Sequence, residues 1–95
     1  MNSTFWEQRY MIQMLLRIRD TPGQTKTQLI NEGWNDEGSM RTRFRRIADL
    51  IEAGYVQVSG LKPGAHNIMR MELTPRGVQT AALFDAIEKL GEGSP

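Results

Sequence analysis

Apolar residues recur every three or four positions along much of the chain, which is the spacing of an amphipathic helix. The first such stretch covers residues 4–19, and residues 4–7 (Thr-Phe-Trp-Glu) have the spacing of a capping box. Proline and glycine within residues 20–23 favour a turn that ends it. This pattern predicts a first helix whose buried face carries Met11, Leu15 and Ile18.

A second capping box follows at residues 25–28, Thr-Lys-Thr-Gln. It is typical of the start of a short helix, and Leu29 and Ile30 are its apolar residues. Gly33 is positioned to end this helix, and residues 34–38 form a short connection to the next one. Trp34 in that connection is predicted to pack under the turn between the two helices.

The third predicted helix, residues 39–53, carries four arginines near its start. Ser39 can cap its first turn, and Gly54 supplies the residue with positive φ that ends such helices. Placing residues at 100° intervals predicts one apolar face, which comprises Met40, Phe44, Ile47, Leu50 and Ile51. The same wheel puts Arg45, Thr42 and Asp49 opposite that face, with Arg41 and Arg46 on the flanks.

After Gly54 the apolar pattern changes to alternation, which is typical of β-strands. Residues 55–58 and 69–73 alternate on either side of a loop rich in glycine and proline, and such an arrangement predicts a β-hairpin. Thr74-Pro75 then begins a last helix that is apolar over a wide arc as far as Leu90. Residues 91–95 are expected to form a frayed tail.

Three helices, a hairpin and a final helix predict an α+β fold in one domain, residues 1–95: a helix-turn-helix core with the hairpin as a wing. Two segments, residues 50–56 (Leu-Ile-Glu-Ala-Gly-Tyr-Val) and 71–77 (Met-Glu-Leu-Thr-Pro-Arg-Gly), resemble winged helix-turn-helix transcriptional regulators of the small prokaryotic or archaeal MarR/PadR-like type. The chain departs from the MarR type at the wing tip, residues 62–66, where that family often has an acidic residue followed by arginine. It also lacks the long extra helices of the MarR dimer.

Length and composition exclude several classes of protein. The 95 residues include no cysteine, so disulfides and thiolate metal sites are excluded. Apolar runs are too short to span a bilayer, and the N-terminus lacks the pattern of a signal segment. We therefore expect a cytoplasmic protein without a membrane partner. The net charge is only +1, but residues 39–76 carry seven basic side chains against three acidic ones. Such a concentration of positive charge favours a polyanionic partner.

The arginine-rich helix provides the candidate DNA contacts. Arg41, Thr42 and Arg45 point away from the predicted core, where arginine can bind guanine and threonine can contact thymine. Arg43 and Arg46 lie nearer the apolar face and suit phosphate contacts. Asp49 is expected to pair with Arg45 or Arg46 and orient it. The alternative interpretation is that this is a solvated basic face.

Further contacts are predicted on either side of this helix. The start of the second helix is expected to touch phosphate, and the wing to touch the adjacent backbone or minor groove. The histidine of the wing is not a metal ligand, because no cysteine or suitably spaced acidic residue accompanies it. These predicted contacts, together with the cap of the third helix, are Thr25, Lys26, Thr27, Ser39, Lys62, His66 and Arg70.

No set of residues supports catalysis or a cofactor, since the sequence contains no nucleophile–base arrangement and no glycine-rich phosphate loop. We therefore predict a sequence-specific regulator of transcription that binds double-stranded DNA as a repressor, and as a homodimer through its first and last helices. Trp6, with Phe5 and Tyr10, offers aromatic surface for that contact. The alternative is a winged helix that binds an acidic protein partner. The sequence specifies no pocket for a small-molecule effector.

Overall fold

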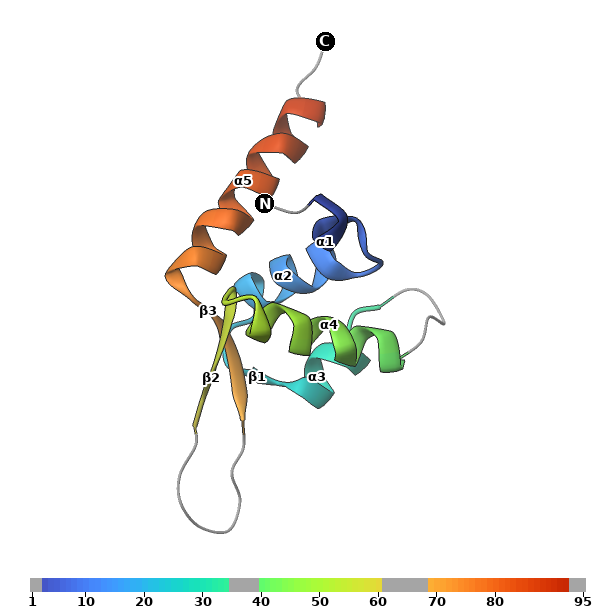
Figure 1. Ribbon diagram of the computed structural model, residues 1–95, viewed down its shortest axis with the longest axis vertical. Helices are drawn as coiled ribbons and strands as arrows, with labels where there is room; N and C mark the ends of the chain where they lie inside the picture. The colour runs from blue at the N-terminus through green and yellow to red at the C-terminus, as the bar shows by residue number, and fades with distance from the viewer. Residues whose placement is uncertain (1–2, 35–39, 61–68, 93–95) are drawn as a thin grey trace.

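The computed structural model describes residues 3–34, 40–60 and 69–92. In Figure 1 the helices lie above and beside a small sheet, and the last helix extends away from the rest. None of the helices in these ranges is long and apolar enough to cross a membrane. The elements in chain order are α1 (Ser3–Glu7), α2 (Met11–Asp20), β1 (Gln24–Thr25), α3 (Lys26–Asn31), α4 (Met40–Glu52), β2 (Val56–Ser59), β3 (Arg70–Leu73) and α5 (Pro75–Glu92).

The first predicted helix is in fact two helices, which corrects the prediction of one helix over 4–19. The break lies at Tyr10, whose φ of 69° is in the left-handed region. Tyr10 is buried, and its ring lies edge-on to Trp34 with 5.2 Å between the ring centroids. The left-handed conformation is unfavourable for a residue other than glycine. At Tyr10 it occurs together with a contact to the ring of Trp34, which is distant in the sequence. Thr4 lies inside α1 rather than ahead of it as a cap.

The capping box predicted for the second helix is confirmed at α3. The backbone nitrogen of Gln28 donates to Thr25 Oγ1 at 3.3 Å, and the backbone nitrogen of Thr25 donates to Gln28 Oε1 at 3.0 Å. The short strand β1 just ahead of it was not predicted. It pairs antiparallel with β3, so the hairpin becomes a three-stranded sheet in the order β1-β3-β2.

The predicted hairpin is confirmed in β2 and β3. These strands are antiparallel, with Val56 opposite Leu73 and Ser59 opposite Arg70. Residues 61–68, which connect the two strands, lie outside the described part of the chain. Val56 and Met71 are buried, so one face of the sheet packs on the helices.

The junction between the sheet and α5 depends on Thr74 and Gly77. Thr74 Oγ1 accepts a hydrogen bond from the backbone nitrogen of Gly77 at 3.1 Å, and so caps α5 as predicted. The same hydroxyl donates to the carbonyl of Gly54 at 2.7 Å, which ties α5 to the end of α4. Gly77 packs so closely that an added Cβ would lie 2.1 Å from the carbonyl oxygen of Tyr55. Only glycine fits there.

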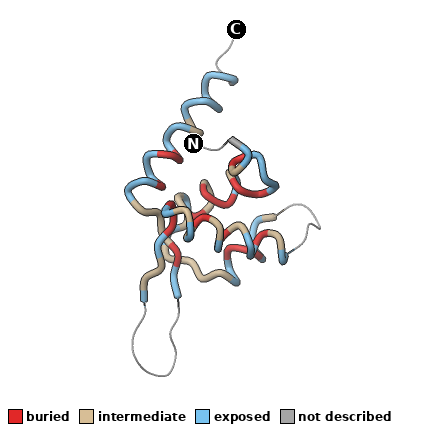
Figure 2. Tube along the Cα trace, viewed as in Figure 1, coloured by how far each residue is buried: buried red, intermediate tan, exposed pale blue. Residues whose placement is uncertain are grey.

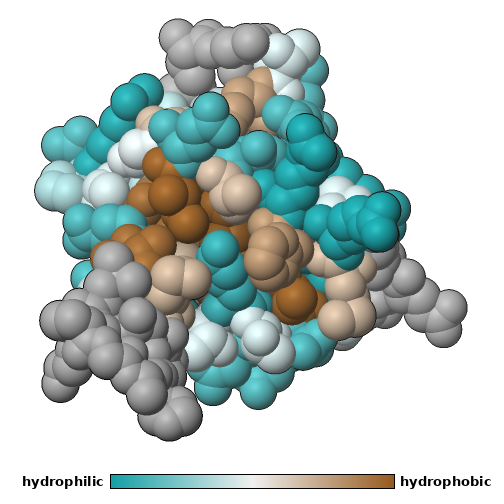
Figure 3. Space-filling view, turned by 60° about the horizontal axis from the view of Figure 1, so that its bottom comes forward, coloured by the Kyte–Doolittle hydropathy of each residue, from teal (hydrophilic) through white to brown (hydrophobic). Residues whose placement is uncertain are grey.

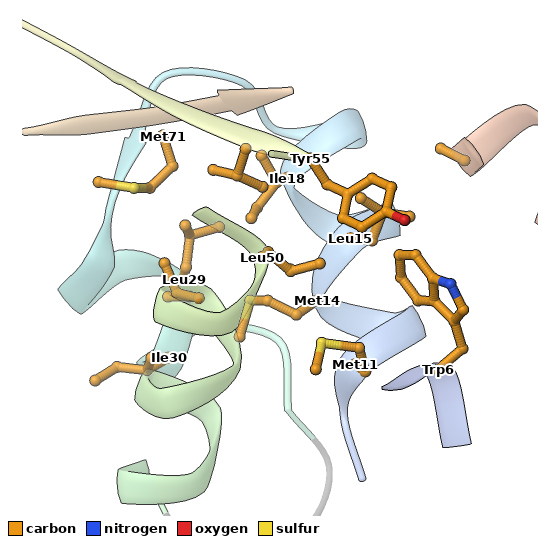
Figure 4. Packing of buried hydrophobic residues seen from close by; sticks show 13 residues of the cluster. Trp6, Met11, Met14, Leu15, Ile18, Leu29, Ile30, Leu50, Tyr55 and Met71 are labelled. Atoms are coloured by element: carbon orange, nitrogen blue, oxygen red, sulfur yellow. The ribbon is translucent and has the colours of Figure 1, made fainter. Parts of the chain in front are cut away.

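The core lies between the helices and the sheet, as Figures 2 and 4 show. Trp6 belongs to this core: it is 7% exposed and lies edge-on to Tyr55 and Phe84. With Tyr10 also buried, these two rings are not available for the subunit contact expected from the sequence. The largest fully buried side chains are Met11, Met14, Leu15, Ile18, Leu29, Ile47, Leu50 and Met71.

Helix α5 packs on the core by its first half only. Ala81 is buried and Phe84 is half-buried, whereas Leu83, Ile87 and Leu90 are between 60% and 77% exposed. Arg19 on α2 forms an ion pair with Asp85 that joins α5 to α2. A hydrogen bond to Asp20 and this pair with Asp85 raise the pKa of the Arg19 guanidinium. The helix continues to Glu92, so residues 91–92 are helical rather than part of the expected tail.

Candidate nucleic-acid interface

Helix α4 turns a different face to the core from the one that the apolar pattern predicts. Met40 and Phe44, both predicted to be buried, are 50% and 45% exposed. Ile47 and Leu50 are buried as predicted, but the third buried side chain is Arg43, so the helix is rotated about its axis relative to the predicted wheel. As a result, the exposed face of α4 comprises Met40, Arg41, Phe44, Arg45, Ala48 and Glu52.

Arg43 was predicted to contact phosphate, and its burial corrects that prediction. Its side chain is in the core, with the residue only 5% exposed. Its Nε donates to the carbonyl oxygen of Ile30 at 2.9 Å, and its guanidinium lies over the rings of Tyr10 and Trp34 at 5.5 and 5.1 Å. Arg43 thus holds α4 against α3 and cannot reach a phosphate.

Trp34 packs against the core, as predicted, and the turn that follows it lies outside the described residues. Trp34 is partly buried against the core, and its Nε1 donates to the carbonyl oxygen of Leu29 at 2.7 Å. The guanidinium of Arg17 lies 5.5 Å from its ring centroid. Two arginines and a tyrosine therefore surround this indole. The guanidinium groups of Arg17 and Arg43 form cation–π interactions with its ring, so these two arginines stabilise the fold at this site.

Arg46 is also engaged within the chain. Its Nε donates to the carbonyl oxygen of Arg9 at 2.9 Å, and its Nη1 pairs with Asp49 Oδ2 at 2.8 Å. The predicted pairing of Asp49 with an arginine one turn away is confirmed. The side chain of Arg46 is only 13% exposed, so this arginine holds α4 to the α1–α2 junction and is a poor phosphate ligand.

Arg41 and Arg45 are the two arginines of α4 that face solvent, as predicted. Arg45 borders a shallow hollow between α1 and α4 that is also lined by Phe5, Gln8 and Glu52. Thr42, predicted to point outward beside them, is only partly exposed. Helix α4 therefore presents two exposed arginines to a partner, whereas the sequence predicts four.

Lys26, in the first turn of α3, extends the exposed face of α4. Its Nζ lies 5.0 Å from the ring centroid of Phe44, which places the start of α3 beside the middle of α4. Thr27 is exposed next to it, whereas the hydroxyl of Thr25 already takes part in the capping box. Sequence reasoning missed Phe44, because a phenylalanine at helical spacing is most simply assigned to the core.

The wing contributes Arg70 to the described surface. Arg70 is exposed on β3, and its Nη1 donates to the carbonyl oxygen of Gly23 at 2.8 Å. This bond fixes the side chain along the edge of the sheet nearest α3, since Arg70 is opposite Thr25 in β1. The predicted contacts Ser39, Lys62 and His66 lie outside the described residues.

The end of the molecule that faces the viewer in Figure 3 is not uniformly polar. Brown and tan atoms gather near the centre of this view, and teal atoms surround them. The exposed large apolar side chains of the chain include Met40 and Phe44 on α4 and Met69 just before β3. The exposed face of α4 thus combines apolar and basic groups.

Solved structures of transcriptional regulators have the same architecture. The regulator SlyA covers 97% of this chain with a TM-score of 0.73 and 19% identity, and a MarR protein from Peptoclostridium difficile covers 94% with a TM-score of 0.71 and 22% identity. FabT of Streptococcus pneumoniae, solved in complex with DNA, covers 93% with a TM-score of 0.65 and 17% identity. The chain spans 64%, 56% and 62% of the length of these three chains.

No protein-family model and no curated protein matches the sequence. The structural likeness confirms the winged helix-turn-helix fold that the sequence predicts. In that fold α3 and α4 are the helix-turn-helix pair, and the hairpin of β2 and β3 is the wing.

Proposed function

We propose that the chain is a sequence-specific regulator of transcription that binds double-stranded DNA and inserts α4 into the major groove. The observation that carries this proposal is the exposed face of α4, where Arg41 and Arg45 lie beside Phe44 and where Lys26 joins from α3. A major groove is wide enough for one α-helix, and arginine is the commonest reader of guanine there. The likeness of fold to FabT, which was solved in complex with DNA, supports DNA as the partner.

Different side chains serve affinity and specificity in this proposal. Arg41 and Arg45 read base edges, whereas Lys26 and Thr27 bind phosphate and set the register of the helix. Arg70 stands at the base of the wing, and Lys62 and His66 of the wing loop contact the adjacent backbone or minor groove. Arg43 and Arg46 have no part in binding, because their guanidinium groups are used inside the fold.

We further propose that the chain represses transcription as a homodimer in the cytoplasm. A domain of this size acts on transcription most simply by occupying a site that another protein needs. The exposed stripe Leu83, Ile87 and Leu90 has the spacing of one helical face, and its burial in a second copy would remove apolar surface from water. A symmetric dimer requires two half-sites about one helical turn of DNA apart.

Selection of bound duplexes from a random pool, with the full chain as bait, tests this function. The proposal predicts enrichment of a site with two inverted half-sites about ten base pairs apart. Enrichment of single half-sites would overturn the dimer and leave DNA reading in place. If no sequence is enriched and duplex affinity at low salt is negligible, DNA binding is wrong, and the winged helix serves a protein partner instead.

A further inference from the structure

We infer that Phe44 is a specificity-determining residue that contacts the 5-methyl group of thymine. This inference rests on the proposed function. Phe44 is the largest apolar side chain on the exposed face of α4, and nearly half of it is open to solvent. Burial of a phenylalanine ring in the core would lower the free energy of the folded chain. In α4, however, the ring of Phe44 is exposed and Arg43, one residue earlier, is buried.

Lys26 gives the ring a defined setting. Its ammonium lies 5.0 Å from the ring centroid of Phe44, within the range of a cation–π interaction. Lys26 belongs to α3 and Phe44 to α4, so the contact ties the ring to both helices of the helix-turn-helix pair. The positive charge beside the ring also suits the phosphate next to a base that the ring touches.

The neighbours of Phe44 extend the apolar strip along the helix. Met40 and Ala48 lie one turn before and one turn after it, and both are exposed. Arg41 and Arg45 run beside this strip and offer only hydrogen-bond donors.

The major groove has one apolar feature, the 5-methyl group of thymine, and phenylalanine is one of the side chains that contact it. The strip beside the arginines therefore suits a site in which thymine adjoins guanine. A protein partner would also bury Phe44 against its own apolar side chains, and the removal of a single methyl group from the DNA separates the two cases.

The test replaces thymine by uracil, one position at a time, in a duplex that the chain binds. This change removes only the methyl group, and affinity is measured for the wild type, Phe44→Ala and Arg41→Ala. The wild type is expected to lose about fourfold in affinity at one position of each half-site, because the complex no longer buries one methyl group there. Phe44→Ala is expected to bind thymine and uracil equally at that position, whereas Arg41→Ala keeps the fourfold difference.

The outcomes separate this inference from the proposed function. Equal thymine-to-uracil losses in the wild type and in Phe44→Ala, or no loss at any position in the wild type, would overturn the role of Phe44 while DNA binding stands. If the wild type binds no duplex, the proposed function fails first. Because Phe44 is half-exposed, Phe44→Ala should fold, and circular dichroism checks this.

Discussion

Arg43 donates a hydrogen bond from its Nε to the carbonyl oxygen of Ile30, 13 residues earlier, across a distance of 2.9 Å. This bond joins the helix that reads DNA in our proposal to the helix before it. The guanidinium is also enclosed by Tyr10 and Trp34. The angle between α3 and α4 therefore depends on an arginine that a charge pattern alone would assign to the outer surface.

Replacement of Arg43 should reduce stability rather than remove a DNA contact. Arg43→Ala deletes the donor to Ile30 and the contacts with two rings, so we expect a loss of about 3 kcal/mol in the free energy of unfolding. The matched change Arg41→Ala, at an exposed position two residues earlier, should alter that free energy by less than about 0.5 kcal/mol. Urea denaturation measures both. Equal stability of the two variants would show that Arg43 is not a structural residue.

The close contact between Gly77 and Tyr55 predicts strong intolerance of a methyl group. Gly77→Ala would place Cβ 2.1 Å from the carbonyl oxygen of Tyr55, and either α5 or the end of α4 must move. We expect destabilisation of about 3 kcal/mol by thermal or urea unfolding. Gly91→Ala, in the same helix with nothing within 4 Å of the added Cβ, should stabilise the protein by roughly 0.5 kcal/mol. A neutral Gly77→Ala would contradict the described junction.

Lys26 should contribute to DNA affinity without choosing a sequence. Lys26→Ala removes one predicted phosphate contact, so the slope of log affinity against log salt should fall by about one. The set of preferred sequences should stay the same. Gln13→Ala, at an exposed position of α2 on a different part of the molecule, serves as the control and should leave the slope unchanged. A change of base preference in Lys26→Ala would mean that Lys26 reads bases.

Some elements of this protein follow from short-range signals alone. The capping box at Thr25 and Gln28 is made within four residues, and the positive φ of Gly54 ends α4 where the sequence places it. Thr74 likewise caps α5 with a hydroxyl three residues from its partner. Such features depend on neighbours in the chain, and the sequence therefore predicts the order of elements and the fold.

The errors arise where distant residues decide the outcome. Tyr10 breaks the first helix without glycine or proline, and its ring packs on Trp34, which is distant in the sequence. Strand β1 has only two residues, and in its pairing with β3 Thr25 lies opposite Arg70, 45 residues later. The rotation of α4 depends on the carbonyl of Ile30, which no periodic pattern reveals. The same rotation moves Phe44 into the candidate site and removes Arg43 from it.

The exposed end of α5 predicts an association that one charge should disrupt. Ile87→Glu places a carboxylate at the middle of the stripe formed by Leu83, Ile87 and Leu90. We expect the wild type to have the mass of a dimer by light scattering at micromolar concentration, and Ile87→Glu that of a monomer. Because Ile87 is 64% exposed in the single chain, folding should be unaffected. Glu88→Gln, the adjacent control, should remain a dimer, and a monomeric wild type would contradict the assembly.

Whether the exposed face of α4 reads DNA is decided by the affinity of the chain for a selected duplex, compared among the wild type, Arg45→Ala and Arg41→Ala at fixed salt. We expect salt-dependent binding by the wild type, and in each variant a loss of about 1–3 kcal/mol in binding free energy with relaxed preference at one base position. Both variants should unfold at the same urea concentration as the wild type. Unchanged duplex affinity in both variants at low salt would contradict the claim that the exposed face of α4 reads DNA.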